Sequence, residues 1–296
     1  ANQGNGEIYY TTLIAKLLCL AANKLASLDP FGVGIEMEAN KPSWYDALNG
    51  LPGLFGSSIS ETIELKRLAQ FLKGAIESLG LNEGDKINIF EELFDFIAPI
   101  ASLLKTETDN FGYWDKSYLE KDRYRKKILL GISGIEKELT IGEIRDFLNL
   151  VIEKTTKAIS GACGKSDICS TYFINEVKEY EIISQKEGEE TYIRPTKFSQ
   201  KPLPLFLEGP VHALRIEKDI QKAQRLYLAV KKSELFDKKL KMYKVNGCLS
   251  AETEEIGRAR VFPRGWLENE SIWTHMEYKY LLEVLRSGLY EEFYSD

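Results

Sequence analysis

An acid and an indole stand two residues apart in the glycine-rich segment 41–61. They are Trp44 and Asp46. Aromatic rings pack on the C–H faces of a pyranose, and a carboxyl beside an apolar ring keeps its proton near neutral pH because desolvation raises its pKa. Such a carboxyl can protonate a glycosidic oxygen. The pair therefore indicates sugar chemistry, and the structural alternative is an anchoring tryptophan beside a turn-capping aspartate.

A second group of polar side chains lies between Arg258 and His275. It contains three arginines, Trp266, Trp273 and one of the two histidines of the chain. Guanidinium and imidazole groups suit a phosphate or carboxylate ligand. His275 falls in the first turn of the last predicted helix, where amide donors and the helix dipole favour an anion. The alternative is a surface loop with solvated arginines and a core histidine.

The first group resembles a loop of a known enzyme family. Residues 43–49 read Ser-Trp-Tyr-Asp-Ala-Leu-Asn. This is similar to the Asp-Trp-Asn-Asp-Gly-Met-Asn loop of cellobiose phosphorylase and related inverting disaccharide phosphorylases, with which it shares Trp44, Asp46 and Asn49, while Ser43 and Tyr45 replace the first Asp and the first Asn. The resemblance implies that Asp46 is the general acid and that Trp44 contacts the sugar. Glu61 resembles the glutamate of the next family segment, Gly-Glu-Ser, and is an expected sugar-binding residue.

The second group resembles a later segment of the same family. Residues 268–275 read Glu-Asn-Glu-Ser-Ile-Trp-Thr-His, similar to the family pattern Glu-Asn-Gly-Gly-Ile-Phe-x-His at the same spacing. The two residues after Asn269 replace glycines of that pattern. The resemblance implies that Glu268 and Asn269 shape the sugar site and that His275 binds phosphate, with Arg264 as a second phosphate ligand.

The resemblance implies a carbohydrate-active enzyme that cleaves a β-linked glucoside or oligosaccharide by inverting phosphorolysis. Asp46 protonates the leaving oxygen and inorganic phosphate, the co-substrate, attacks the anomeric carbon, so no cofactor, metal or second catalytic carboxylate is expected. An inverting glycoside hydrolase is one alternative, with Glu61, Glu268 or Glu270 as its base. A non-catalytic carbohydrate-binding or structural helical domain is another, and it predicts that Asp46 and His275 do not converge.

The elements that position these residues are predicted to be mostly helices. Helical periodicity covers about 8–28, 60–79, 88–104, 113–132, 141–159, 216–232 and 271–287. Ser60 is the expected N-cap of its helix. Thr140 and Glu143 have the spacing of a capping box. Two strands, 171–183 and 190–195, are predicted to form a hairpin.

Sequential long helices favour helical hairpins arranged as a bundle or a ring. The resemblance implies the ring, a mainly α fold that is an α/α toroid, a partial (α/α)6 barrel with a small β-hairpin insertion. We expect 1–296 to be a single helical domain, part of a larger catalytic domain, with an insertion at about 81–240. Family members are longer, so the remainder of a parent chain is an expected partner, and activity of the chain alone stays open.

The composition limits the other classes of partner. The net charge of −6 carries no basic stripe, which argues against nucleic acid. Lysines interrupt the longest apolar region, so no membrane span is expected. Cys163 and Cys169 lack a second pair of ligands, which argues against a zinc site. All four cysteines, including Cys19 and Cys248, are expected to be reduced, and the location cytoplasmic.

Overall fold

The chain forms two compact units where the sequence predicts one. The structure is a computed structural model that describes residues 1–296 apart from 38–52, 108, 164–165 and 185–189. Unit 1 comprises Ala1–Ile35 and Glu61–Gly161, and unit 2 comprises Glu36–Ser60 and Ala162–Asp296. The predictions of one helical domain and of an insertion at about 81–240 stay predictions.

The predicted fold class, a mainly α toroid, is wrong. The chain is a mixed α/β protein, 52% helical and 18% strand. Within the described residues one sheet has four strands, in the order β1-β2-β5-β6, and two further sheets have two strands each. Helical periodicity shows that a segment is a helix, but it does not show how helices are arranged, and that arrangement came from the resemblance alone.

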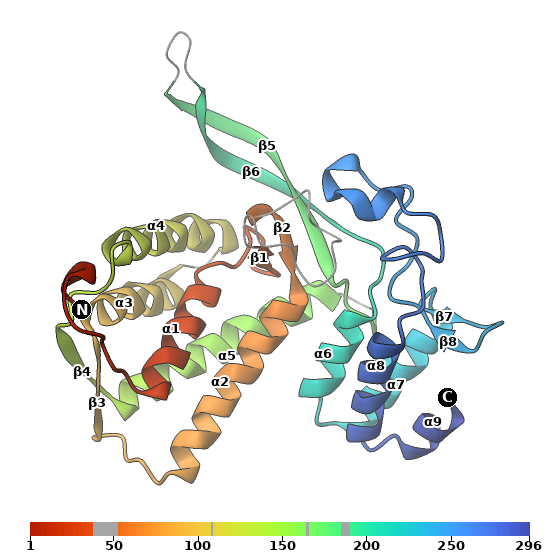
Figure 1. Ribbon diagram of the computed structural model, residues 1–296, viewed down its shortest axis with the longest axis horizontal. Coiled ribbons are helices and arrows are strands. Elements are labelled where there is room, and N and C mark those ends of the chain that lie inside the picture. Colours follow the sequence, from red (N-terminus) through yellow and green to blue (C-terminus); the bar gives the residue numbers. More distant parts are fainter. Residues whose placement is uncertain (38–52, 108, 164–165, 185–189) are drawn as a thin grey trace. The chain divides into compact units, whose positions relative to one another are not determined.

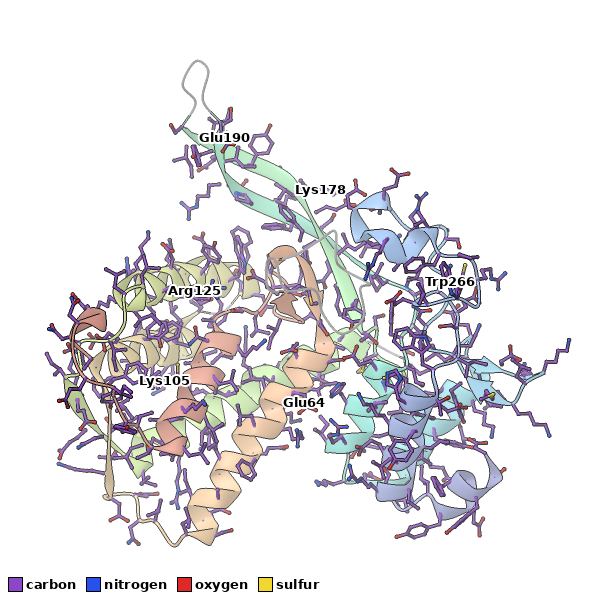
Figure 2. All side chains as sticks on the ribbon, in the orientation of Figure 1. Glu64, Lys105, Arg125, Lys178, Glu190 and Trp266 are labelled. Carbon is purple, nitrogen blue, oxygen red and sulfur yellow. A yellow bond between two sulfur atoms is a disulfide. The ribbon has the colours of Figure 1, made fainter. Side chains whose placement is uncertain are left out.

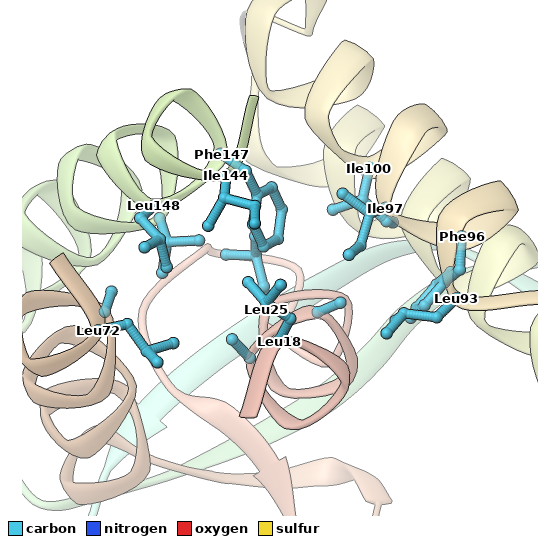
Figure 3. Close-up of a cluster of buried hydrophobic side chains, with 14 of the residues drawn as sticks. Leu18, Leu25, Leu72, Leu93, Phe96, Ile97, Ile100, Ile144, Phe147 and Leu148 are labelled. Atoms are coloured by element: carbon cyan, nitrogen blue, oxygen red, sulfur yellow. The ribbon is translucent and has the colours of Figure 1, made fainter. Parts of the chain in front are cut away.

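Unit 1 is a group of helices around one apolar core (Figure 1). Its elements are η1 (Asn2–Gly4), α1 (Leu13–Leu25), α2 (Ile59–Ser78), β3 (Lys86–Phe90), α3 (Glu91–Thr106), α4 (Asn110–Ile128), β4 (Glu136–Thr140) and α5 (Ile141–Cys163). Figure 3 shows side chains of α1, α2, α3 and α5 meeting in this core. Leu18, Leu25 and Ile144 are 0% exposed there, so the predicted helices are confirmed by a shared buried face.

Two short strands in unit 1 lead directly into helices. Strand β3 pairs antiparallel with β4, with Ile87 opposite Leu139 and Ile89 opposite Lys137. Helix α3 follows β3, and α5 follows β4, without an intervening loop. Five alternating residues that continue into a helical pattern are difficult to distinguish from the first turn of that helix. For this reason the sequence analysis missed both strands.

Of the two predicted helix N-caps, the one at α5 is confirmed and the one at α2 is wrong. At α5 the amide of Glu143 donates to Thr140 Oγ1 over 3.2 Å, and the amide of Thr140 donates to Glu143 Oε2 over 2.8 Å. The capping box is therefore confirmed, and its bonds hold the pKa of Glu143 below its ordinary value. Ser60 lies inside α2, and its buried Oγ has no hydrogen-bond partner in the described part of the chain. The predicted Ser60 cap is therefore wrong.

Replacing Thr140 by alanine is expected to lower the free energy of unfolding by about 1 kcal/mol, because the first turn of α5 loses its cap. Thr156→Ala is the control, since Thr156 is an exposed residue in the interior of the same helix. Urea denaturation of both variants measures the difference. Equal losses for the two substitutions would show that the cap contributes nothing beyond the loss of a threonine.

Unit 2 combines the four-stranded sheet with short helices. Its elements are β1 (Ile35–Met37), at the boundary with unit 1, β2 (Gly53–Ser58), β5 (Tyr172–Ser184), β6 (Tyr192–Pro202), α6 (Glu208–Ile216), α7 (Ile220–Lys232), β7 (Phe236–Asp237), β8 (Met242–Tyr243), η3 (Glu254–Ile256), η4 (Arg258–Val261), α8 (Thr274–Arg286) and α9 (Tyr290–Ser295). The predicted hairpin is confirmed as β5 and β6. The predicted helix 216–232 begins only at Ile220, after α6 has ended.

The core of unit 2 lies between α6, α7 and α8 and contains two tyrosines whose rings are in tilted contact. The rings of Tyr243 and Tyr280 are 4.7 Å apart, and both side chains are almost completely buried. Helix α8 packs against α6 through Met276 and Val284 on its buried face. Gly288, with a φ of +81°, follows the C-cap of α8, Ser287. The core therefore fixes the position of α8, the helix that carries His275.

The cysteines differ from the prediction. Cys163 and Cys169 form a disulfide, so the prediction that all four are reduced is wrong, while Cys19 and Cys248 are free. A spacing of six residues does not reveal that the two sulfurs are bonded. Disulfides are typical of oxidising compartments, so cysteine usage no longer argues for the cytoplasm. In the part of the chain that the structure describes, every helix is too short or too polar to cross a bilayer.

Candidate functional site

The second motif lies entirely within unit 2, whereas the first lies outside the described residues. Arg264, Glu268, Asn269 and His275 belong to unit 2, and Glu61 belongs to unit 1. Trp44 and Asp46 fall in 38–52, so their predicted roles stay predictions. The predicted convergence of the two motifs also stays a prediction. The site can therefore be built from the loop that precedes α8.

Asn269 is a buried residue whose side-chain hydrogen bonds stabilise this loop. Its side chain is 0% exposed. Its Oδ1 accepts the amide of Leu249 at 3.0 Å, and its Nδ2 donates to the carbonyl of Phe262 at 2.7 Å and to Ser250 Oγ at 3.2 Å. Both amide hydrogens of Asn269 are thus used within the protein. Its contribution is to shape the loop that carries Glu268.

A second buried asparagine, Asn246, joins the loop to the segment after β8. Its Oδ1 accepts the amide of Glu270 at 2.7 Å, and its Nδ2 donates to the carbonyl of Glu268. The amide of Val245 donates to the carbonyl of Ser271 at 2.8 Å. These bonds run alongside one another, so the backbone at 268–271 is held firmly against residues 245–246.

Glu268 places a carboxylate inside this loop. The residue is 8% exposed, and its Oε2 is buried with no hydrogen-bond partner among the residues that the structure describes. A buried carboxylate oxygen without a donor costs free energy, and such groups in folded proteins call for an explanation.

Glu270 lies between two cations. Its Oε1 is 2.9 Å from Lys244 Nζ and 3.0 Å from Arg264 Nη2, while its Oε2 accepts from Arg264 Nε. The Arg264 guanidinium and then Lys244 lower the pKa of Glu270 to about 2, although burial opposes this shift. The carboxylate is therefore ionised at neutral pH. Arg264, which is predicted to bind phosphate, thus forms an ion pair with a carboxylate of its own loop.

His275 is the second residue of α8, as the sequence predicts. Its ring lies over the indole of Trp273, with ring centres 5.4 Å apart and planes inclined at 29°. Burial lowers the pKa of His275 below its ordinary value, and the positive charge of Lys279 lowers it further. The imidazole is therefore mainly neutral at pH 7 and can donate one N–H to an anion.

Glu61 contributes to a separate feature of unit 1, a pocket of about 400 Å³ between α1 and α2. Figure 2 labels Glu64, which lies on α2 one turn after Glu61. Glu61 pairs with Lys24 over 2.9 Å, and Glu64 pairs with Arg67 over 2.6 Å. The other lining residues are apolar: Leu20, Leu65, Leu68 and Phe71. The pocket is thus lined by two ion-paired carboxylates and by apolar side chains.

Lys244 and Asn246 are site residues that the sequence analysis missed. Residues 241–246 read as a short extended segment, and β8 covers part of it. That pattern does not indicate that Lys244 or Asn246 contributes to a site. Lys244 approaches Glu270 only because the chain folds back on itself, since the two residues are 26 positions apart in the sequence. Contacts of this kind depend on the path of a loop, which periodicity does not encode.

The chain has no match that would assign this loop to a family. No family model matches it, and no curated protein matches it. The resemblance of residues 43–49 and 268–275 to the disaccharide phosphorylases therefore stays a prediction, and the function below is a proposal based on it.

Proposed function

We propose that this chain is a carbohydrate-active enzyme domain of the disaccharide phosphorylase type, which cleaves a β-linked glucoside or oligosaccharide by inverting phosphorolysis. The observation that carries the proposal is the loop 268–275. Its sequence resembles the phosphorylase pattern at Glu268, Asn269, Ile272 and His275. It also combines a buried carboxylate that has an open acceptor, Glu268, with a neutral histidine at a helix N-terminus, His275. A sugar hydroxyl and a phosphate fit these two groups.

In the proposed reaction Asp46 donates its proton to the glycosidic oxygen as the bond from that oxygen to the anomeric carbon breaks. Phosphate attacks the same carbon from the opposite face, so a β-linkage gives an α-sugar 1-phosphate and the leaving sugar keeps the proton as a hydroxyl. Trp44 packs against the sugar ring. Glu268 accepts hydrogen bonds from its hydroxyls.

The phosphate is held at the start of α8 in this proposal. The neutral imidazole of His275 donates one N–H, and the first amides of α8 add donors and the positive end of the helix dipole. Arg264 contributes a guanidinium, whose paired donors match two phosphate oxygens. Asn269 acts indirectly, because it fixes the loop between Arg264 and His275.

Inverting hydrolysis is the second candidate, and Glu268 is the observation that favours it. A hydrolase needs a carboxylate base that activates water opposite the general acid. The buried, unbonded Oε2 of Glu268 has the character of such a base. Hydrolysis and phosphorolysis differ in whether phosphate is consumed, so phosphate binding separates them.

Titration of inorganic phosphate into the protein by calorimetry, with and without glucose or cellobiose, tests the proposal. His275→Ala is expected to weaken phosphate binding about tenfold or more, because a charge-assisted hydrogen bond contributes about 1.5–3 kcal/mol. His212→Gln is the matched control, since His212 is the other histidine and lies 3.7 Å from Glu208 in α6. Sugar binding without phosphate binding would favour the hydrolase or a non-catalytic binding domain.

The proposal includes a cytoplasmic location. A charged sugar phosphate does not cross a membrane, so the product stays where the enzyme forms it. The Cys163–Cys169 disulfide is more typical of oxidising compartments. The state of this pair in freshly lysed cells, measured by thiol alkylation and mass spectrometry, therefore tests the location independently of the reaction.

A further inference from the structure

The carboxylate of Glu270 is held in the manner of a bound anion. Arg264 presents Nε and Nη2 side by side to its two oxygens, and Lys244 approaches Oε1 from another segment at 2.9 Å. This is the paired-donor geometry with which arginine binds carboxylate and phosphate alike. The three groups therefore form an anion site whose occupant is a side chain of the protein.

Lys244 is held beside the loop by the surrounding backbone, whereas Arg264 is exposed to solvent. Lys244 directly follows β8, and the bonds from residues 245 and 246 to residues 270 and 271 keep it beside the loop. The side chain of Lys244 is 15% exposed and that of Arg264 is 70% exposed. Solvent and small anions therefore reach the site from the side of Arg264.

The backbone conformation of Glu270 does not depend on the ion pairs of its carboxylate. Its φ is +57°, a left-handed conformation that glycine adopts without strain. Its amide is bonded to Asn246. The side chain can rotate out of the site while the loop keeps its shape. At this position the phosphorylase pattern has glycine, which carries no carboxylate to compete with a ligand.

We propose that Lys244 and Arg264 together bind the phosphate oxyanion, and that Glu270 fills this site as an internal competitor until phosphate displaces it. The inference rests on the proposed function and adds Lys244 to its phosphate ligands. It also adds a regulatory contact, because phosphate must reach a higher concentration than an open site would require. Displacement is a simple exchange of one anion for another on the same two cations.

Glu270→Gln tests this by removing the charge and keeping the shape. The variant is expected to bind inorganic phosphate about tenfold more tightly than the unmodified chain, since a charge-assisted contact contributes about 1.5–3 kcal/mol. Adding Lys244→Met to the variant is expected to abolish the gain. Glu254→Gln is the matched control, because it removes a carboxylate 3.1 Å from Arg260 on the same unit and is expected to change nothing.

Glu270→Gly protects the test against a folding defect, because glycine suits the φ of +57° at this position. It is expected to show the same gain, with thermal denaturation confirming the folded state. Equal phosphate affinities for the unmodified chain and both variants would overturn the internal competitor. A gain that survives Lys244→Met would overturn the role of Lys244.

These outcomes are distinct from failure of the proposed function. Phosphate binding that His275→Ala abolishes but Glu270→Gln leaves unchanged refutes the competitor and supports phosphorolysis. Absence of phosphate binding in every variant refutes both.

Discussion

Replacing Asp46 by asparagine is expected to slow cleavage of a β-linked disaccharide by about 10³-fold, within the range that general acid catalysis contributes. Asparagine has nearly the same size as aspartic acid but no acidic proton to donate to the leaving oxygen. A β-glucoside whose leaving group is a nitrophenol needs little protonation, so its cleavage is expected to slow much less. Reaction rates on the two substrates measure the difference.

The matched control for this prediction is Asp115→Asn. Asp115 also lies close to a tryptophan, Trp114, but at the start of α4 in unit 1. It is expected to leave both rates unchanged. Equal slowing of both substrates by Asp46→Asn would assign Asp46 to substrate binding, and no slowing would remove it from the site.

Replacing Asn269 by alanine is expected to lower the free energy of unfolding by about 3–5 kcal/mol, because each buried group left without a partner costs roughly 1–3 kcal/mol. The groups are the amide of Leu249 and the carbonyl of Phe262. Gln221→Ala, at an exposed position of α7, is the control. Urea denaturation gives the two values.

Phosphate binding is expected to weaken in the same Asn269 variant, since the loop between Arg264 and His275 loses its support. A stability change below 1 kcal/mol, no larger than that of a typical surface substitution, would show that the buried amide does not hold this loop.

Helices could be predicted from the sequence, but their arrangement could not. The periodic segments that became α1, α2 and α5 bury one face each, so their pattern was clear. Strands β3 and β4 are too short to show a pattern of their own, and each runs directly into a helix. The toroid prediction is wrong because the sequence pattern of one helix does not indicate which other helices it packs against.

The features of the candidate site that depend on neighbouring residues in the sequence can be predicted. The position of His275 at the start of α8 follows from the sequence, and the spacing of Glu268 and Asn269 pointed to their loop. The burial of Asn269 and the approach of Lys244 to Glu270 depend on a chain path set by distant bonds. The Cys163–Cys169 disulfide is not predicted for a similar reason, since a spacing of six residues does not show that the two sulfurs meet.

Product analysis with cellobiose as substrate tests the central claim most directly. Phosphorus and proton magnetic resonance spectra are recorded with and without inorganic phosphate. Phosphorolysis predicts α-glucose 1-phosphate and glucose in equal amounts, and no cleavage when phosphate is omitted. Release of glucose alone, at a rate independent of phosphate, would contradict the account and identify the chain as a hydrolase.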